Sequence, residues 1–283
     1  MRSVDADPAW SEPRGEVHPL ARCVADERLV SLHFDTSTYQ VGALRGTRNG
    51  LVIDEVLADG TTRRGTPLDR SKLRVVAWGT RYLEAMQMIH ADFDESFVAS
   101  DPVEASRGLA LFDLLTSAQR TGTLVEVFLE GDADGWWPGR VVGLSGALVI
   151  LHLLDDRRLE WNGYVALRLD RAERVALDPI SRARLHVLER RGPPSKTFPC
   201  TTMESHLASF AGSRTIVGLA DADPTASFVG FVEDVDRNTR LQFLTPLGED
   251  DGLYDMPSPS IVACEWNTAY LLSLAQLRTQ RFL

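Results

Sequence analysis

Cysteine and lysine are both scarce in this chain. Its three cysteines, Cys23, Cys200 and Cys264, lie far apart in 283 residues. An odd number at such spacing argues against a disulfide framework and against a zinc site of the CxxC type. It favours a reducing, cytoplasmic location. Lysine occurs only as Lys72 and Lys196, and we assign no function to this bias because codon composition alone can produce it.

Long apolar runs are also missing. The apolar stretch 147–154 is interrupted by His152 and ends at Asp155, well short of the roughly 18–20 residues that a membrane-spanning helix needs. Residues 1–20 lack the apolar core of a secretion signal and are rich in charge and proline. We therefore predict a disordered leader over 1–20 and no membrane partner.

The sequence has no recognisable catalytic or metal-binding motif. The patterns GxxxxGK[ST], HExxH and GxSxG do not occur, nor does a GxGxxG that opens a helix. Residues 130–135 start like a calcium loop, but the twelfth position is Val141 instead of a bidentate glutamate, so a hairpin turn is favoured. Neither the six scattered histidines nor Cys200 has the neighbours that a site would need. We predict no enzymatic activity, no cofactor and no metal.

What the sequence does contain is a layout that recurs three times. Each copy has a strand-like run, a polar turn and a glycine followed by alternating apolar residues, a second strand-like run, and a final segment of helical periodicity. The glycines are Gly42, Gly139 and Gly230, spaced by 97 and 91 residues. The first strand-like runs are 29–35, 124–130 and 215–221, and the helical segments are 82–89, 180–188 and 270–277. Spacings of this size correspond to one small domain per copy.

Several short strands separated by glycine and acidic turns are typical of small antiparallel barrels. We predict a mainly β protein with helices (α+β), in which three tandem five-stranded antiparallel barrels are each flanked by a helix. The predicted domains are a leader (1–20), barrel 1 with its closing helix (21–91), a linker helix with barrel 2 (92–191) and a linker helix with barrel 3 (192–283). Asp101 is a candidate N-cap for the first linker helix, and 201–210 is a weaker amphipathic run.

The order of elements in each copy resembles the Sm-like and SH3-like small β-barrels. The resemblance rests on a helix, a strand, a glycine-containing strand, a further strand, and the sequence Leu169-Asp170-Arg171 before the last strand. Asn162-Gly163-Tyr164 also places the chain near uncharacterised bacterial proteins built from such units. The uridine-binding signatures of Sm proteins are not evident. The resemblance therefore implies the fold and does not by itself imply RNA binding.

Two features bear on protein binding. The pair Trp136-Trp137 beside the first hairpin of copy two either caps the barrel end or anchors a partner, and Trp161 lies near another turn. Residues 214–280 carry four basic and ten acidic side chains, a net charge of −6. The predicted partner-binding residues are Trp136, Trp137, Trp161, Asp250, Asp251 and Asp255. Our leading hypothesis is a non-catalytic protein-interaction scaffold or inhibitor of an unknown protein partner, with an acidic immunity-type protein as its most concrete form.

The alternative is an Sm-like nucleic-acid-binding protein. A net charge of −10 and a pI near 5.1 oppose contact with phosphate backbones. Copy one is the exception, because residues 29–90 carry eight basic and six acidic side chains. The candidate nucleic-acid-binding residues are Arg45, Arg48, Arg63, Arg64, Arg70, Lys72 and Arg74. A solvated face, or one that docks on the acidic third copy, explains the same cluster.

Overall fold

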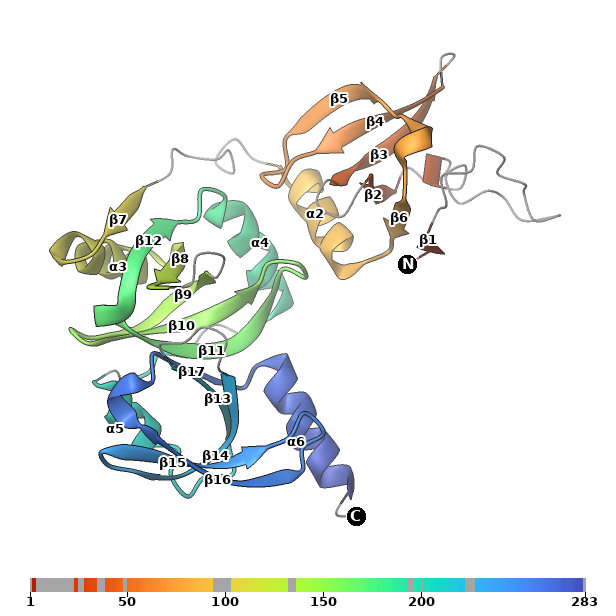
Figure 1. The fold of residues 1–283 in the computed structure, drawn as a ribbon. Helices are drawn as coiled ribbons and strands as arrows, with labels where there is room; N and C mark the ends of the chain where they lie inside the picture. Colours follow the sequence, from red (N-terminus) through yellow and green to blue (C-terminus); the bar gives the residue numbers. More distant parts are fainter. Residues whose placement is uncertain are drawn as a thin grey trace. The chain divides into compact units, whose positions relative to one another are not determined.

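The chain divides into two compact units. The computed structural model describes residues 2–3, 23–24, 28–34, 39–47, 50–93, 103–131, 136–192, 196–199, 201–221 and 227–281. The first unit comprises 1–100, 157–159 and 182–190, and the second comprises 101–156, 160–181 and 191–283. Each unit is described by itself below (Figure 1). No helix in the described ranges is long and apolar enough to span a membrane.

The first unit is built on one antiparallel sheet of six strands in the order β1-β6-β2-β3-β4-β5. Its core gathers Val30, Leu32 and Ile53, all fully buried. Thr80 caps the closing helix by accepting a hydrogen bond from the backbone N–H of Leu83. The elements are β1 (Arg2–Ser3), β2 (Leu29–His33), β3 (Tyr39–Thr47), β4 (Gly50–Val56), β5 (Thr62–Pro67), the 3₁₀ helix η1 (Arg70–Lys72), β6 (Val75–Trp78) and α2 (Arg81–Ala91).

The second unit contains an antiparallel sheet of eleven strands in the order β16-β15-β14-β13-β17-β11-β10-β9-β8-β12-β7. Its first elements are β7 (Glu104–Ser106), α3 (Leu109–Thr121), β8 (Leu124–Leu129), β9 (Trp137–Leu144), β10 (Leu148–Asp155), β11 (Glu160–Arg168), η3 (Leu169–Arg171), β12 (Ala172–Leu177) and α4 (Ser181–Arg191), most of which belongs to the first unit. The rest are α5 (Met203–Ala208), β13 (Ile216–Ala220), β14 (Ser227–Val235), β15 (Asn238–Leu244), β16 (Asp250–Pro257), η4 (Ser258–Ser260), β17 (Ala263–Trp266) and α6 (Ala269–Arg281).

The prediction of three small five-stranded barrels, each flanked by a helix, is wrong. Four strands, a 3₁₀ turn, a strand and a helix do follow one another in 29–91, 124–191 and 216–281. The strands assigned to barrels two and three nevertheless form one open sheet, because β17 pairs with β13 on one side and with β11 on the other. Within the described residues no pairing joins β5 to β6 or β16 to β17, as closed barrels would need.

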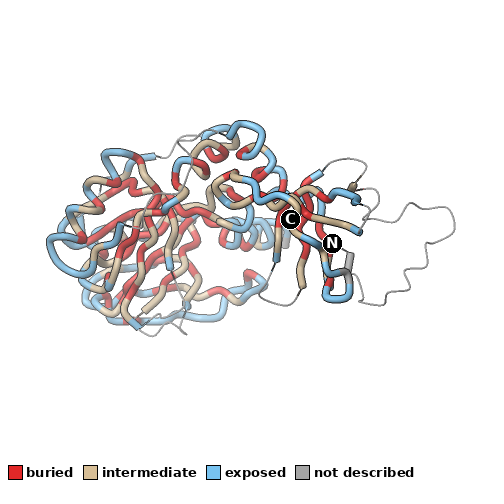
Figure 2. The backbone as a smooth tube through the Cα atoms, turned by 90° about the horizontal axis from the view of Figure 1, so that it is seen from above, coloured by how far each residue is buried: buried red, intermediate tan, exposed pale blue. Residues whose placement is uncertain are grey.

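Two cores lie on opposite faces of the eleven-stranded sheet, and β10 belongs to both. Val149 and Leu151 pack into one core, whereas Leu148 and Ile150 pack into the other. This explains the almost wholly apolar sequence of β10, since a strand that is covered on both faces has no polar side to alternate with. Figure 2 shows the buried positions concentrated along the strands and the exposed positions at the turns.

The three glycines of the recurring layout lie where two strands approach closely. A Cβ built on Gly42, Gly139 or Gly230 would overlap the carbonyl oxygen of Asp54, His152 or Gln242 on the neighbouring strand. The absence of a side chain at these positions therefore allows β3, β9 and β14 to bend against the strands that follow them.

The segments between the copies differ from the prediction in one place. The first linker helix begins at Leu109, because Glu104–Ser106 extends as β7 and pairs with β12. Asp101 lies outside the described residues. The run 201–210 forms α5, capped by Thr202. Of the predicted leader, Arg2–Ser3 forms β1, which pairs with β6, and residues 4–20 lie outside the described residues.

Candidate binding site on β13–β16 and α6

Alternate residues of β13, β14 and β15 divide this end of the sheet into two faces. Val217, Val232 and Leu241 point into the core that also contains Met203 and Leu207 of α5. On the opposite face, residues of the three strands pack against α6 instead. That second cluster consists of Ile216, Leu244, Leu271 and Leu274, with Val229, Phe231 and Ala275 against it. The helix therefore covers one face of the three strands, and the core with α5 covers the other.

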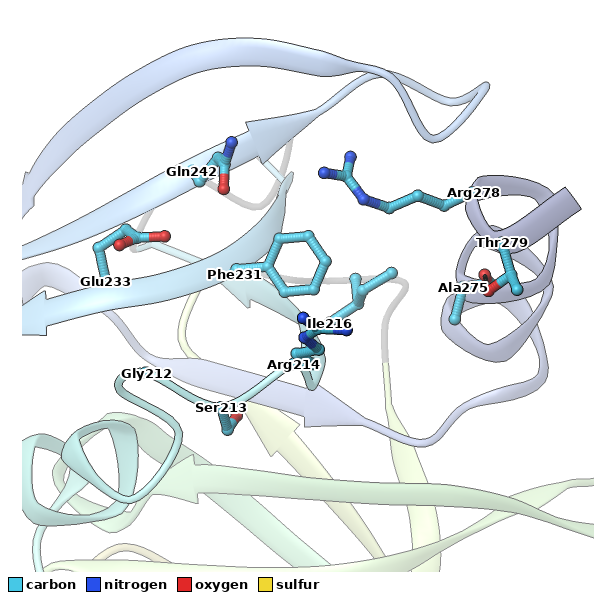
Figure 3. A pocket seen from close by; sticks show the side chains of 10 residues that line it. All are labelled: Gly212, Ser213, Arg214, Ile216, Phe231, Glu233, Gln242, Ala275, Arg278 and Thr279. Atoms are coloured by element: carbon cyan, nitrogen blue, oxygen red, sulfur yellow. Dashed lines mark hydrogen bonds between the residues drawn. The ribbon is translucent and has the colours of Figure 1, made fainter. Parts of the chain in front are cut away.

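A pocket of about 720 Å³ lies at the end of this helix–sheet layer. Figure 3 shows its lining side chains converging from the turn before β13, from β14 and β15, and from α6. Apolar side chains of Ile216, Phe231 and Ala275 form its floor. The lining residues are Gly212, Ser213, Arg214, Ile216, Phe231, Glu233, Gln242, Ala275, Arg278 and Thr279. We call this site the α6 pocket.

The polar groups of the α6 pocket differ in how they are bonded. Arg278 donates hydrogen bonds to both carboxylate oxygens of Asp250, at 2.6 and 3.1 Å, and its guanidinium carbon lies 5.3 Å from the centre of the Phe231 ring. The side chains of Arg214, Glu233 and Gln242 form no hydrogen bond or ion pair with any other described residue. The pocket therefore holds one fixed cation and three polar groups with unused bonding capacity.

Strand β16 forms one edge of the eleven-stranded sheet (Figure 1). Leu253 and Tyr254 are 65% and 41% exposed. Leu253 pairs in register with Gln242, so its side chain lies on the same face as the α6 pocket. Tyr254 points to the other face, where its ring lies 4.8 Å from the ring of Phe243. We call the unpaired side of this strand, over Leu253 to Met256, the β16 edge.

The three acidic residues predicted to bind a partner all lie on β16, which brings them together. Asp255 accepts two hydrogen bonds from Arg240, at 2.9 and 3.0 Å, and this interaction lowers the pKa of the Asp255 carboxyl. Asp250 is held by Arg278. The side chain of Asp251 is exposed and forms no hydrogen bond or ion pair with another described residue.

The three predicted tryptophans do not form one surface. Trp137 packs half-buried against the core on one face of the sheet, next to Val127 in register. Trp161 lies on the opposite face, where its ring stacks on His152 at 4.1 Å. Trp136 precedes β9 and is 47% exposed. Only Trp136 retains the exposure of an aromatic anchor.

The basic residues of the first unit are partly neutralised by carboxylates. Arg45 donates two hydrogen bonds of 3.1 Å to Asp54, which lowers the pKa of that carboxyl. Arg63 pairs with Glu55 at 3.4 Å and Lys72 pairs with Asp69 at 3.5 Å. Arg64 and Arg74 are exposed. Arg48 and the side chain of Arg70 lie outside the described part of the chain.

Burial shifts the pKa values of several titratable groups elsewhere in the second unit. Burial lowers the pKa of His206 and of His152 to about 4, and the charge of Arg140 adds to the effect at His152. The Nε2 atom of His206 is buried without a hydrogen-bond partner. Burial raises the pKa of Glu265 to about 7. In the ranges the structure describes, no three His, Cys, Asp or Glu residues are grouped so that they could hold a metal ion.

Residue-by-residue inspection of the sequence missed Leu253 and Tyr254, as well as Arg214, Glu233 and Gln242 of the α6 pocket. The first two were detectable, because an exposed apolar pair directly follows three acidic residues and a glycine in 249–254. The pocket residues carry no sequence signal, since they come from a turn, two strands and a helix spread over 68 positions, 212–279.

No family model matches the chain, and no curated protein matches it. Among solved structures, YcgR from Escherichia coli in complex with c-di-GMP aligns over 67% of this chain and 93% of its own, with 8% identity and a TM-score of 0.15. MrkH from K. pneumonia in its apo state aligns over 63% and 92%, with 10% identity and a TM-score of 0.13. TM-scores this low support no conclusion about fold or function.

Proposed function

We propose that the chain is a non-catalytic protein-binding module that captures an extended, basic segment of a partner protein along the β16 edge. The observation that carries this proposal is the exposure of Leu253 and Tyr254 on an edge strand that no other described strand covers. Adding a strand to an open sheet edge is a common mode of peptide recognition.

The edge strands β7 and β5 offer less apolar surface to a partner than β16 does. Strand β7, at the far end of the eleven-stranded sheet, is three residues long. Strand β5, at the edge of the six-stranded sheet, carries Arg63 and Arg64 and ends in Pro67. Short length discourages strand addition at β7. Strand β5 has no large apolar side chain, whereas charged residues and a terminal proline are common to β5 and β16. Strand β16 is eight residues long and exposes two large apolar side chains.

The geometry limits where a partner strand would pair. The register between β15 and β16 shifts between Gln242 and Leu244, and Gly252 has a φ of +92°, so a bulge precedes Leu253. Pro257 has no N–H to donate. Pairing is therefore centred on 253–256, and alternate partner side chains would lie beside Leu253 on one face and beside Tyr254 on the other.

The acidic residues in 249–255 favour a partner segment of positive charge. Glu249, Asp250, Asp251 and Asp255 lie within seven consecutive residues, and Asp255 and Asp250 pair with Arg240 and Arg278. The surrounding segment 214–280 has a net charge of −6. Complementary charge accelerates association and selects partners. We therefore expect lysine and arginine to alternate with apolar residues in the bound segment. The nucleic-acid alternative has less support, because Arg45, Arg63 and Lys72 are ion-paired.

The experiment is selection from a displayed library of random 12-residue peptides on the purified full chain. We expect enriched sequences in which apolar and basic residues alternate. Their affinity should fall at least about ten-fold for Leu253→Asp and should fall with added salt. The matched control is Leu247→Asp, because Leu247 is 56% exposed but lies in the turn before β16.

Synthetic versions of the enriched peptides test the mode of binding. Methylating alternate backbone nitrogens removes the donors that strand addition needs, so one of the two methylation patterns should abolish binding and the other should not. Enrichment of acidic peptides, or an equal loss of affinity for Leu253→Asp and Leu247→Asp, would overturn the proposal.

A further inference from the structure

The α6 pocket has the size of a small-molecule site. Its volume of about 720 Å³ falls within the roughly 300–1,000 Å³ that is usual for ligand pockets. Its apolar floor belongs to the cluster that joins α6 to β13 and β14, so its shape is fixed by packing. Pockets of this kind bind ligands through an apolar body and a few convergent polar groups.

The polar groups around that floor are of three different kinds. Arg214 comes from the turn before β13, Glu233 from β14 and Gln242 from β15, and Figure 3 shows them around Phe231. None of the three bonds to another described residue. A cation, an anion and an amide are therefore available to a single ligand, each in a separate place.

The charge around the pocket is balanced. Arg214 and Arg278 are offset by Glu233 and by Asp250, which holds Arg278. A ligand with several negative charges would meet two carboxylates, and a polycation would meet two guanidinium groups. The complement of this set is a molecule that carries one charge of each sign at opposite ends.

We propose that the α6 pocket binds a zwitterion of dipeptide size with an apolar side chain. Its carboxylate pairs with Arg214, its ammonium with Glu233, and its peptide group with the amide of Gln242, which can donate and accept at once. The apolar side chain rests on Phe231 and Ile216. This site is separate from the β16 edge, because none of its groups depends on a strand added to β16.

The test is calorimetric titration of the full chain with the dipeptide leucylleucine, N-acetyl-leucylleucine and leucylleucine amide. We expect binding of the free dipeptide and a loss of affinity on the order of ten-fold for each blocked form, because each blocking group removes one charge-assisted contact. A protein C-terminus would supply only the carboxylate. If the acetylated form binds as well as the free dipeptide, the ligand is a chain end, and the assignment of Glu233 fails.

Two variants assign the contacts. Arg214→Gln should weaken binding of leucylleucine about ten-fold and leave the amide unchanged, whereas Glu233→Gln should weaken leucylleucine and leave the acetylated form unchanged. Arg237→Gln, an exposed position in the turn between β14 and β15, is the matched control. Absence of binding at millimolar leucylleucine, or equal binding of all three compounds, would overturn the proposal. Tyr254→Asp, on the face of β16 away from the pocket, should leave dipeptide binding intact and weaken binding of the peptides of the proposed function, which separates failure here from failure there.

Discussion

Glu265 is half-buried on β17, between Val165 of β11 and Gly218 of β13 in the register of the sheet. Gly218 offers no side chain at this point, and the nearest atoms to a Cβ built there would be Cβ of Glu265 at 3.7 Å and Cδ2 of Leu271 at 4.0 Å. The Cβ of Glu265 therefore lies beside apolar neighbours. Burial raises the pKa of the Glu265 carboxyl from 4.5 to about 7, since removal from water disfavours the charged form.

The raised pKa of Glu265 makes the protein less stable as pH rises. Between pH 4.5 and about 7 the folded state keeps a proton that the unfolded state has lost, so the free energy of unfolding falls across this window and is flat above it. Glu265→Gln should remove that fall and raise stability at pH 8 by on the order of 2 kcal/mol, with little change at pH 4.5. Urea unfolding at the two pH values measures this. An equal effect at both would contradict the assigned ionisation.

Burial of His206 makes the protein less stable as pH falls, which is the reverse of the effect of Glu265. The ring of His206 lies 4.7 Å from Trp266 and 5.2 Å from Phe210, and burial lowers its pKa from 6.5 to about 4. Protonation therefore favours the unfolded chain, and stability is lost as pH falls from about 6.5 towards 4. His206→Leu should reduce the loss by on the order of 2 kcal/mol. Thermal unfolding at pH 7 and pH 4.5 measures the difference. His90→Leu is the control, because His90 is exposed on α2.

At the level of single elements, the close approach of strand β9 to β10 depends on Gly139. Gly139→Ala should destabilise the protein by about 1–3 kcal/mol, because the new methyl group meets the His152 carbonyl and β9 must move away from β10. The matched control is Gly146→Ala in the following turn, where no atom lies within 4 Å of the added Cβ. That change should stay within about 0.5 kcal/mol of zero. Chemical denaturation measures the change in the free energy of unfolding for both variants. Equal changes would contradict the explanation by close approach of the strands.

The elements were more predictable than their pairing. Gly42, Gly139 and Gly230 are visible in the sequence because each precedes an alternating apolar run, and the structure places each against a neighbouring strand. The pairing of β11 with β17 could not be predicted from the sequence. It joins 164–167 to 263–266, and the apolar residues of these strands would suit any buried neighbour. Asp250, Asp251 and Asp255 could be proposed from the sequence because they lie within six consecutive residues, whereas Arg214 and Glu233 line one pocket only after folding.

At the level of the whole molecule, β17 makes β8–β12 and β13–β16 parts of one sheet. A substitution that destabilises one part should therefore lower amide protection in the other part as well. We expect Gly230→Ala in β14 to lower amide protection in β13–β17 and also in β10 and β11, since these strands open as one cooperative unit. Hydrogen–deuterium exchange with mass spectrometry measures this, and Gly46→Ala, which adds no contact within 4 Å, is the control. Loosening confined to β13–β16 would show that the two parts open separately.

The position of β17 in the chain also has a consequence for biosynthesis. Strand β11 ends at Arg168, and its partner β17 begins at Ala263, so about 95 residues must be translated before the two can pair. At ordinary rates this interval is on the order of 5–20 s. Throughout it the nascent polypeptide can pair β11 with β10 on one side only, while Val165, Ala166 and Leu167 are fully buried in the finished fold. Until the ribosome has delivered β17, the second side of β11 is therefore an open edge of the kind to which strands of other nascent chains can add.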